Sequence, residues 1–438
     1  MRAQPNKCLP PMWLPFFGNR LGIVKRLSSP VVDPEDFDLH HCFPTTTFIP
    51  ALLGDTREFQ PRAGGAGHSL ADCANRAMGE CLERYASLAY DGGERLVSSY
   101  EGLERLGHRS VPFETLTLFS REQLLSPGFP YKEFTQSTPV GWFEGTDLLS
   151  GAPTCVPGQL VSLGYAPGAD EISPCFYSSS SGCALATTAE GALLGGLLEC
   201  IERDAMVMRW YARLAPPRLD FNVEELLARP LGLPGKGLEI RFHDMTVDGE
   251  VPVVGVTCIE RSGRPCFFVI GCAAALDTFT AARKALLEVG QGRPFIKFLA
   301  NRDTALNGDA TFNGFDSNAR FYAEPANGQY VEWFSQNASV SPRNFLAAPN
   351  SKDPAELCDL LLDRCAASGL TPIGFDMTTP ELREKGLFVC RVFVPELVPL
   401  CVPAAPLFGH PRLTRYIAEA KRAGTAASVP AWAPHPFP

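Results

Sequence analysis

A short acidic sequence that occurs twice restricts the fold of this chain more than any other feature. E-C-L-E-R at residues 80–84 returns as E-C-I-E-R at residues 199–203. The two glutamates of each copy are three residues apart, a spacing that places both carboxylates on one face of a helix. G-H-S at 67–69 and T-T at 187–188 precede the copies at similar distances, and residues 284–293 form a weaker third copy.

Both copies lie in segments with the apolar periodicity of a helix. The first predicted helix covers residues 69–90, and Ser69 begins a sequence close to a capping box. The second covers residues 188 to about 212 and opens at Thr187, with Glu190 three residues later. The second helix is apolar on almost every side, which is typical of a buried helix.

Carboxylates on a buried helix are unfavourable unless cations or metal ions accompany them. Two such helices that face each other would bring four carboxylates together. Mg²⁺ prefers oxygen ligands, often one or two carboxylates with phosphate oxygens. The arginine that ends each copy adds a donor for phosphate.

Other interpretations of the repeat are weaker. The first is a pair of amphipathic helices with surface Glu–Arg pairs, but two copies with matched upstream residues argue against it. The second is a carboxylate-bridged di-iron site, which normally has a histidine three residues after a glutamate, and these helices have none. The common phosphate-binding loops are also missing, because Gly235-Lys236-Gly237 lacks the spacing that they require.

The rest of the chain predicts an α+β fold with no long linker between independent halves. Residues 1 to about 60 read as loops with short strands, and residues 305–350 as loops and short elements. Residues 251–258 and 266–273 read as a β-hairpin. Further strands are predicted at 138–143, 372–376 and 387–394, and further helices at about 278–290 and 353–368.

Composition limits the function classes. The formal net charge of −9 gives no sign of nucleic-acid binding or of an anionic membrane as partner. None of the 15 cysteines forms a C-x-x-C pair, which favours reduced thiols in a cytoplasmic protein. The N-terminus lacks the apolar core of a signal peptide, and no apolar run approaches the roughly 18 residues of a membrane helix.

Taken together, these residues resemble the YcaO family. The resemblance runs through residues 65–67 and 79–84, then 181–184 and 199–204, then 288–293, with weaker similarity at 375–378 and 392–395. It covers the chain from about residue 20 to the end. It implies a YcaO-type fold in which mixed or antiparallel sheets and helices enclose an ATP site.

The resemblance also implies roles for individual residues. Arg203 and Lys284 would contact phosphate, Arg203 with a catalytic role, and Gln291, Arg293 and Thr187 would line the nucleotide site. Lys25 with Ser28 or Ser29 is a further phosphate-binding candidate. The family often has Gly-Lys-Gly at residues 65–67 and Asn at 187, where this chain has Gly-Ala-Gly and Thr. The implied Mg²⁺ ligands are Glu80, Glu83, Glu199, Glu202 and Glu288.

The end of the chain, Pro434-His435-Pro436-Phe437-Pro438, is similar to the P-x-P-x-P ending of azoline-forming YcaO enzymes. Proline fixes φ and stiffens a tail. We therefore expect the tail to place the carboxylate of Pro438 in the active site, where it orients a group or accepts a proton.

The resemblance implies an ATP- and Mg²⁺-dependent cyclodehydratase that acts on a ribosomally made precursor peptide. Expected partners are a leader-binding protein that resembles a ubiquitin-activating enzyme and a flavin-dependent azoline dehydrogenase. A homodimer within a larger complex is also expected. Thioamide- or amidine-forming chemistry and a non-catalytic nucleotide-binding scaffold are alternatives. The expected domains are an N-terminal segment at 1–60, a catalytic core at 61–402 and a Pro-rich tail at 403–438.

Overall fold

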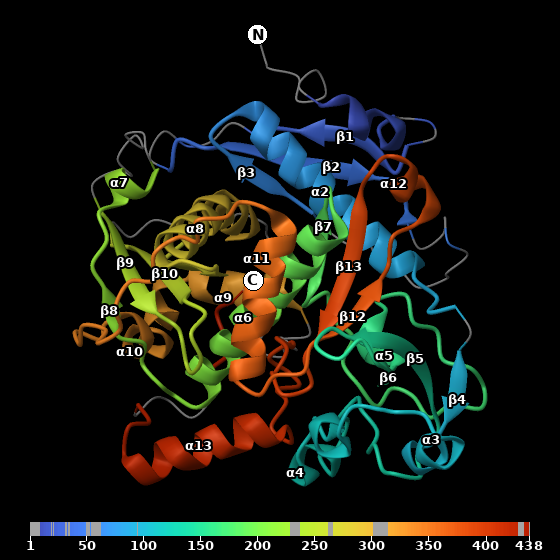
Figure 1. Cartoon of the computed structure of the whole chain (residues 1–438). Helices are drawn as coiled ribbons and strands as arrows, with labels where there is room; N and C mark the ends of the chain where they lie inside the picture. Colours follow the sequence, from blue (N-terminus) through green and yellow to red (C-terminus); the bar gives the residue numbers. More distant parts are fainter. Residues whose placement is uncertain are drawn as a thin grey trace.

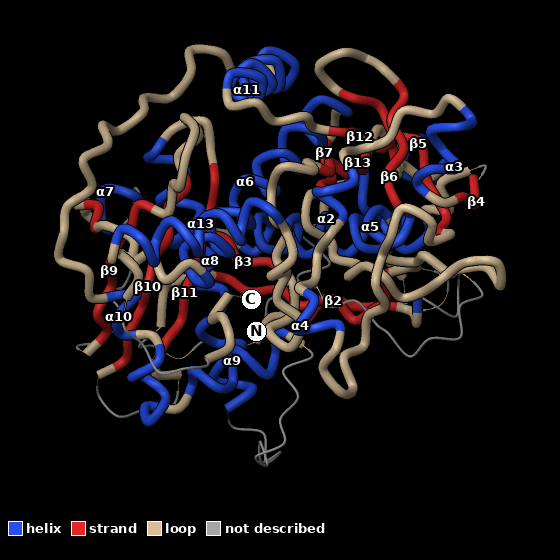
Figure 2. Tube along the Cα trace, turned by 90° about the horizontal axis from the view of Figure 1, so that it is seen from below, coloured by secondary structure: helices blue, strands red, loops and turns tan. Residues whose placement is uncertain are grey.

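Three antiparallel sheets lie around three long helices in the computed structural model (Figure 1). The helices are α2 (Leu70–Ala89), α6 (Ala189–Tyr211) and α8 (Thr278–Ala300). Seen from below in Figure 2, they occupy the middle of the molecule with strands on both sides. The structure describes residues 9–18, 20, 22–30, 33, 36–49, 53, 63–93, 95–227, 237–261, 266–300, 314–427 and 433–437.

A three-stranded sheet near the N-terminus lies against α2. Its strands are β1 (Val24–Ser28), β2 (His40–Thr46) and β3 (Gly65–Gly67), paired in that order. Ser69 is the N-cap of α2, as the sequence predicted, and its side chain accepts a hydrogen bond from the backbone N–H of Asp72 over 3.1 Å. This cap fixes the start of the helix directly after β3.

A six-stranded sheet forms the part of the molecule that lies at the right of Figure 1. The helix α6 packs against its β7 and β13. The N-cap of α6 is Thr188, whose hydroxyl accepts from the N–H of Gly191, so the prediction of a start at Thr187 was wrong by one residue. The strands are β4 (Leu96–Ser98), β5 (Val140–Asp147), β6 (Pro153–Pro157), β7 (Cys183–Ala186), β12 (Ile373–Asp376) and β13 (Phe388–Phe393).

A four-stranded sheet lies under α8. It consists of β8 (Arg218–Leu219), β9 (Leu238–Asp244), β10 (Val253–Glu260) and β11 (Phe268–Ala274). The antiparallel pairing of β10 with β11 confirms the predicted hairpin. Apolar side chains of α8 and β10 are buried together, which holds the helix on the sheet.

The structure corrects the end of one predicted helix and shows a helix within the C-terminal segment. The helix α8 continues ten residues beyond the predicted end at 290 and includes Pro294, because its apolar face stays covered as far as Leu299. The segment 403–438, read as a Pro-rich tail, contains α13 (Pro411–Ala423). Pro411 occupies the first turn of α13, where a missing N–H is tolerated, and Gly424 ends the helix in the left-handed conformation.

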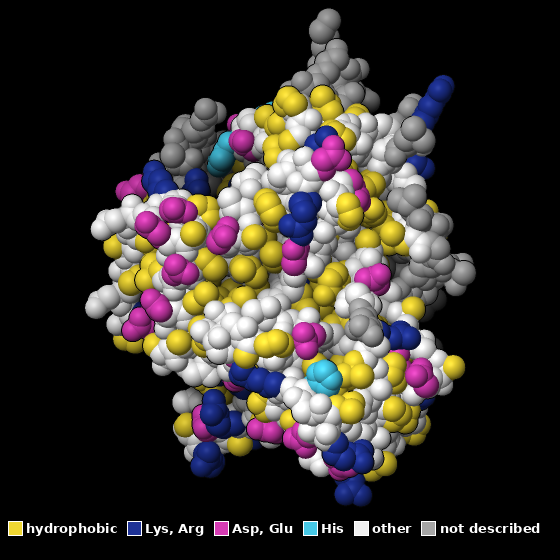
Figure 3. Space-filling view, turned by 45° about the vertical axis from the view of Figure 1, so that its right-hand side comes forward, with side chains coloured by type: hydrophobic (Ala, Val, Ile, Leu, Met, Phe, Trp, Pro, Cys, Tyr) yellow, Lys and Arg dark blue, Asp and Glu magenta, His cyan; other side chains and the backbone are white. Residues whose placement is uncertain are grey.

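The remaining helices are short and lie mostly at the periphery. On the face in Figure 3, charged side chains lie among hydrophobic and uncharged ones, with several acidic side chains together at the left. No described helix has the length and apolarity that crossing a bilayer requires. The helices are η2 (Pro11–Phe16), α3 (Tyr100–Leu106), η3 (Phe113–Leu116), α4 (Arg121–Leu124), α5 (Gly158–Val161), α7 (Val223–Leu227), α9 (Phe315–Ala323), η4 (Pro325–Tyr330), α10 (Glu332–Ser335), α11 (Pro354–Ala367) and α12 (Pro380–Glu384).

Candidate nucleotide and metal site

The first glutamate of α2 accepts two hydrogen bonds. Arg84, one helical turn later, donates from Nη2 to Oε1 of Glu80 over 2.7 Å. The backbone N–H of Gly64, just before β3, donates to Oε2 over 2.8 Å. Both carboxylate oxygens of Glu80 are therefore fixed, one by its own helix and one by the adjacent strand segment.

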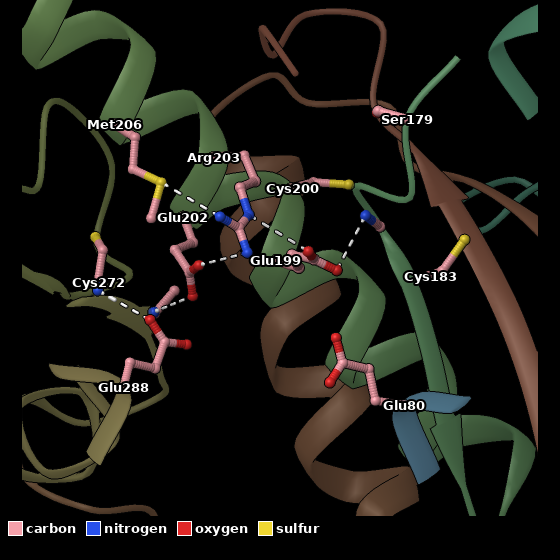
Figure 4. Close-up of polar contacts among 12 residues, drawn as sticks. Glu80, Ser179, Cys183, Glu199, Cys200, Glu202, Arg203, Met206, Cys272 and Glu288 are labelled. Carbon is pink, nitrogen blue, oxygen red and sulfur yellow. Dashed lines mark hydrogen bonds and ion pairs between the residues drawn. The ribbon is translucent and has the colours of Figure 1, made fainter. Parts of the chain in front are cut away.

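Glu199 on α6 is held in the same way. The backbone N–H of Gly182 donates to its Oε2 over 3.2 Å, and Nε of Arg203 donates to its Oε1 over 3.3 Å. An Nη2 of Arg203 also lies 3.6 Å from Oε1 of Glu202. Figure 4 shows the Arg203 guanidinium between these two carboxylates.

The third group of carboxylates meets at β11. The backbone N–H of Cys272 donates to Oε2 of Glu288 over 3.1 Å, and that of Ala274 donates to Oε2 of Glu202 over 3.2 Å. Glu202 comes from α6 and Glu288 from α8, so β11 joins two acidic helices. Figure 4 shows both side chains pointing toward the region around Arg203.

These contacts reveal a threefold structural repeat. The amide donor precedes its glutamate by 16 residues for Glu80, by 17 for Glu199 and by 16 for Glu288. In each case a strand segment leads into the acidic helix and returns an N–H to it. A methyl group at Gly65 or Gly271 would overlap the helix backbone, so both strands need glycine to pack this closely. The weak third copy seen in the sequence therefore shares this amide–glutamate contact with the other two.

Burial and mutual repulsion raise the pKa of three of the glutamates. Burial raises the pKa of Glu202 to about 8, where Glu288 and Glu199 add to the rise and Arg203 opposes it. Burial, followed by the nearby Glu199, raises the pKa of Glu83 well above its usual value. Burial also raises the pKa of Glu288, against the effect of Arg203. These carboxylates are therefore not fully ionised unless a further cation joins them.

Lys284 lies at the same place. It is solvent-accessible, yet desolvation by the surrounding protein lowers the pKa of its ammonium, against the effect of Glu202 and Glu288. The Lys284 ammonium is thus open to solvent on one side and surrounded by protein on the others. Lys284 has no hydrogen bond to another side chain within the described ranges, so its ammonium is available to a ligand.

The carboxylates are grouped but not in direct mutual contact. Across the described residues, no three of them have oxygens within 4.8 Å of one another. A cation bound there would therefore have one or two carboxylate ligands and would complete its shell with other oxygens. That ligand set suits Mg²⁺ with phosphate.

Comparison with known proteins decides the family. Residues 64–398 match the family model described as YcaO cyclodehydratase, ATP- and Mg²⁺-binding. The chain belongs to the YcaO family. The matched residues contain all five glutamates and Arg203, and the fold is the α+β fold that the sequence predicted.

Three solved structures share the fold of this YcaO chain. A heterocyclase in complex with substrate and cofactor superposes with a TM-score of 0.73 at 18% identity, covering 99% of this chain and 57% of that one. YcaO from Methanopyrus kandleri bound with AMPPCP and Mg²⁺ has a TM-score of 0.60 at 19% identity, covering 93% and 90%. The E. coli microcin synthetase McbBCD complex with pro-MccB17 bound has a TM-score of 0.58 at 14% identity, covering 87% and 90%.

A curated relative matches over a shorter stretch. An uncharacterised protein in the tfuA 3′ region of Rhizobium leguminosarum bv. trifolii is 31% identical over 169 residues, which is 36% of this chain and 40% of the relative. This YcaO chain thus spans less than two thirds of that relative and of the heterocyclase.

The other predicted site residues are placed unevenly in the YcaO chain. The amide of Gln291 lies beside Gly64, 3.4 Å from where a Cβ on that glycine would be, and so at the edge of the site. Thr187 is exposed just before α6. Arg293 is only 1% exposed and pairs instead with Asp36 at 2.9 Å, in a separate buried network. Lys25 is exposed on β1.

The C-terminal segment runs into the interior. Tyr322 donates from its hydroxyl to the carbonyl of Pro434 over 2.6 Å, and Nε2 of His435 lies 2.7 Å from the carbonyl oxygen of Cys401. Burial lowers the pKa of His435 to about 4. The hydrogen bond to the carbonyl of Cys401 opposes this shift, and the charge of Arg203 adds to it. The tail therefore passes near Arg203. Pro438 itself lies outside the described residues.

Sequence reasoning missed Arg391. This residue of β13 is 3% exposed, donates to the carbonyl of Leu160 over 2.9 Å and also to that of Ser179. Its charge lies close enough to Glu83 to oppose the rise in the pKa of that carboxyl. A single arginine in the otherwise apolar strand F-V-C-R-V-F was the available signal.

A cavity of about 660 Å³ lies elsewhere. It is lined by residues 218–222, by residues of β9 and by 336–338, and it includes none of the five glutamates of the candidate site. Its lining lacks clustered carboxylates, so it is a poor match for a metal-bound nucleotide.

Proposed function

We propose that this YcaO chain is an ATP-dependent cyclodehydratase that converts Cys, Ser or Thr of a ribosomally made precursor peptide to thiazoline or oxazoline. The observation that carries the proposal is the cluster of Glu199, Glu202 and Glu288 around Arg203, which Glu83 of α2 joins through its interaction with Glu199. No surface role explains so many partly buried carboxylates with raised pKa values.

The acidic residues fit Mg²⁺. They offer only oxygen ligands, backbone amides orient four of them, and their raised pKa values mean that full ionisation needs added positive charge. We assign Glu80, Glu83, Glu199, Glu202 and Glu288 as the residues that would hold the ions. Bound Mg²⁺ supplies positive charge that offsets the charge of a triphosphate.

The cations fit the phosphates. Arg203 is fixed by Glu199 and Glu202, so its planar guanidinium is held ready for an oxyanion. Lys284 faces the same region and has no competing hydrogen bond among the described residues. Gln291 and Thr187 remain candidates for the edge of the nucleotide site.

The reaction needs activation because an amide oxygen is a poor leaving group. The substrate thiol or hydroxyl adds to the preceding backbone carbonyl, and the oxygen of this adduct takes the γ-phosphoryl group of ATP. Loss of phosphate then leaves the ring and ADP. The task of the chain is to hold the peptide and the phosphates in line and to stabilise negative charge with Arg203.

The C-terminal tail supports the azoline-forming branch. Residues 433–437 are buried, and the charge of Arg203 acts on His435, which supports a role for the tail beside the proposed site. In our proposal the carboxylate of Pro438 orients the adding group or accepts its proton.

We further propose that a separate leader-binding protein activates this chain. The chain would then work in the cytoplasm, where its cysteines, nearly all of them buried in the described part of the chain, stay reduced. Strong stimulation of ATP turnover by such a partner is expected. Equal turnover with and without it would contradict this part of the proposal.

The test is a mass spectrum of a Cys-containing precursor peptide incubated with chain, partner, ATP and Mg²⁺. The wild type should remove one water per ring and release ADP and phosphate. Glu199→Gln should abolish both. Glu190→Gln, an exposed residue on the same helix, is the matched control and should behave like wild type. Ring formation that persists in Glu199→Gln would overturn the site assignment.

A further inference from the structure

Three side chains of metal-binding types meet outside the acidic site. A nitrogen of His108, a carboxylate oxygen of Glu144 and Sγ of Cys155 all lie within 4.8 Å of one another. No other such group of His, Cys, Asp or Glu occurs in the described part of the chain. We call these residues the surface triad. In Figure 1 its strands, β5 and β6, lie at the lower right, on the opposite side of the molecule from α8.

Backbone pairing brings the triad together. Glu144 of β5 is the direct cross-strand partner of Cys155 on β6. The N–H of Cys155 donates to the carbonyl of Arg109 over 2.8 Å, and the N–H of Val111 donates to the carbonyl of Cys155 over 3.2 Å. The segment that follows His108 is therefore hydrogen-bonded to both the N–H and the carbonyl of Cys155. Three chain segments converge without any contribution from the side chains themselves.

The side chains of the triad lack partners of their own. None of the three makes a hydrogen bond or an ion pair to another described side chain. The adjacent Arg109 is engaged elsewhere, with Nη2 2.7 Å from Oδ2 of Asp147. A carboxylate thus faces a thiol with no cation between them.

The exposure of the triad also fits a ligand that arrives from solvent. His108 and Glu144 are exposed, whereas Cys155 is only 4% exposed and lies behind them. A cation would enter between the imidazole and the carboxylate and meet the sulfur at the base. The fourth position of a tetrahedral ion would remain open to water.

We propose that His108, Glu144 and Cys155 bind one Zn²⁺ ion. Sulfur, nitrogen and oxygen donors together are typical of zinc, whereas Mg²⁺ and Ca²⁺ prefer oxygen alone. Zinc bonds of about 2.0–2.3 Å require the donors to close in slightly from their present separation. Binding replaces the thiol proton, which leaves to solvent, so affinity rises with pH. The ion would tie the loop after α3 to the β5–β6 hairpin.

The test uses the full-length chain, freed of metal with a chelator and then titrated with Co²⁺ as a spectroscopic substitute for zinc. One equivalent should give a near-ultraviolet sulfur-to-cobalt band, which one equivalent of Zn²⁺ then removes. Cys155→Ser should lose the band, and Glu144→Gln should weaken Co²⁺ binding by about tenfold or more. Because Glu144 is exposed, the second variant tests the proposal even where Cys155→Ser fails to fold.

Two controls separate this site from others. Cys358→Ser, a buried cysteine of α11, should keep the band. Glu199→Gln should keep it too, because ions at the acidic helices would have oxygen ligands only. The absence of a sulfur band, its persistence in Cys155→Ser or its loss in Cys358→Ser would each overturn the proposal.

Discussion

The backbone N–H of Gly182 donates to Oε2 of Glu199 across 3.2 Å, which links the loop before β7 to α6. Gly182 has a φ of +87°, and a Cβ there would overlap the carbonyl oxygen of Val392. Both the conformation and the space require glycine. The orientation of Glu199 therefore depends on a residue that has no side chain.

Gly182→Ala should destabilise the chain by about 2–3 kcal/mol, because it combines left-handed strain with overpacking. It should also lower ATP turnover by displacing the amide that orients Glu199. Denaturant unfolding and ADP release measure the two effects. Gly79→Ala is the control, since a Cβ at this position of α2 meets nothing within 4 Å. It should stabilise the helix by up to about 1 kcal/mol.

Glu202→Gln should stabilise the metal-free chain at high pH while it abolishes Mg²⁺-dependent ATP hydrolysis. The pKa of Glu202 is about 8 in the folded chain against a usual 4.5. Its stabilising contribution is thus complete below pH 4.5 and is lost as the pH rises through 8. The gain from Gln should be about 1–2 kcal/mol at pH 9 and much smaller at pH 6. Unfolding at the two pH values checks this, and an equal gain at both would contradict it.

Phe437→Ala should release the C-terminal segment. Phe437 is fully buried, with ring centroids 6.4 Å from Trp210 and 6.2 Å from Phe334. Loss of a buried phenylalanine removes about 3–5 kcal/mol of packing. We expect ring formation to fall sharply while binding of a non-hydrolysable ATP analogue is unchanged. Lys421→Ala, an exposed change on α13, should affect neither measurement.

Removal of Pro434–Pro438 extends the same prediction. It should abolish cyclisation and leave nucleotide binding intact. If the truncated chain forms rings at the wild-type rate, the tail has no part in the reaction.

Acid should destabilise the chain between pH 6.5 and about 4. Burial is the main cause that lowers the pKa of His41, His410 and His435 to about 4 and that of His243 to about 3. The unfolded state then binds more protons in this window, so the free energy of unfolding falls as the pH falls. His435→Gln removes one of these protons. The slope of the free energy of unfolding against pH should therefore fall by about 1.4 kcal/mol per pH unit. An unchanged slope in urea titrations would contradict the buried, neutral histidine.

The local pattern of the sequence determined the acidic helices and the hairpin. Apolar periodicity and an N-cap serine define α2, and two β-branched runs around a short polar turn define β10 and β11. These features depend on residues a few positions apart, so they can be recognised in the sequence alone. The repeated E-x-x-E-R alone indicated that carboxylates would be gathered.

Only the tertiary structure decided how those carboxylates are held. The amides that orient Glu80, Glu199 and Glu288 come from strand segments 16 or 17 residues earlier. No sequence pattern shows which backbone N–H will meet a distant carboxylate. Arg391 joins Glu83 from a strand about 300 residues away. The pKa of Glu202 depends on how much water packing removes and on which charges remain nearby. Desolvation is a property of the assembled fold, and a local pattern does not contain it.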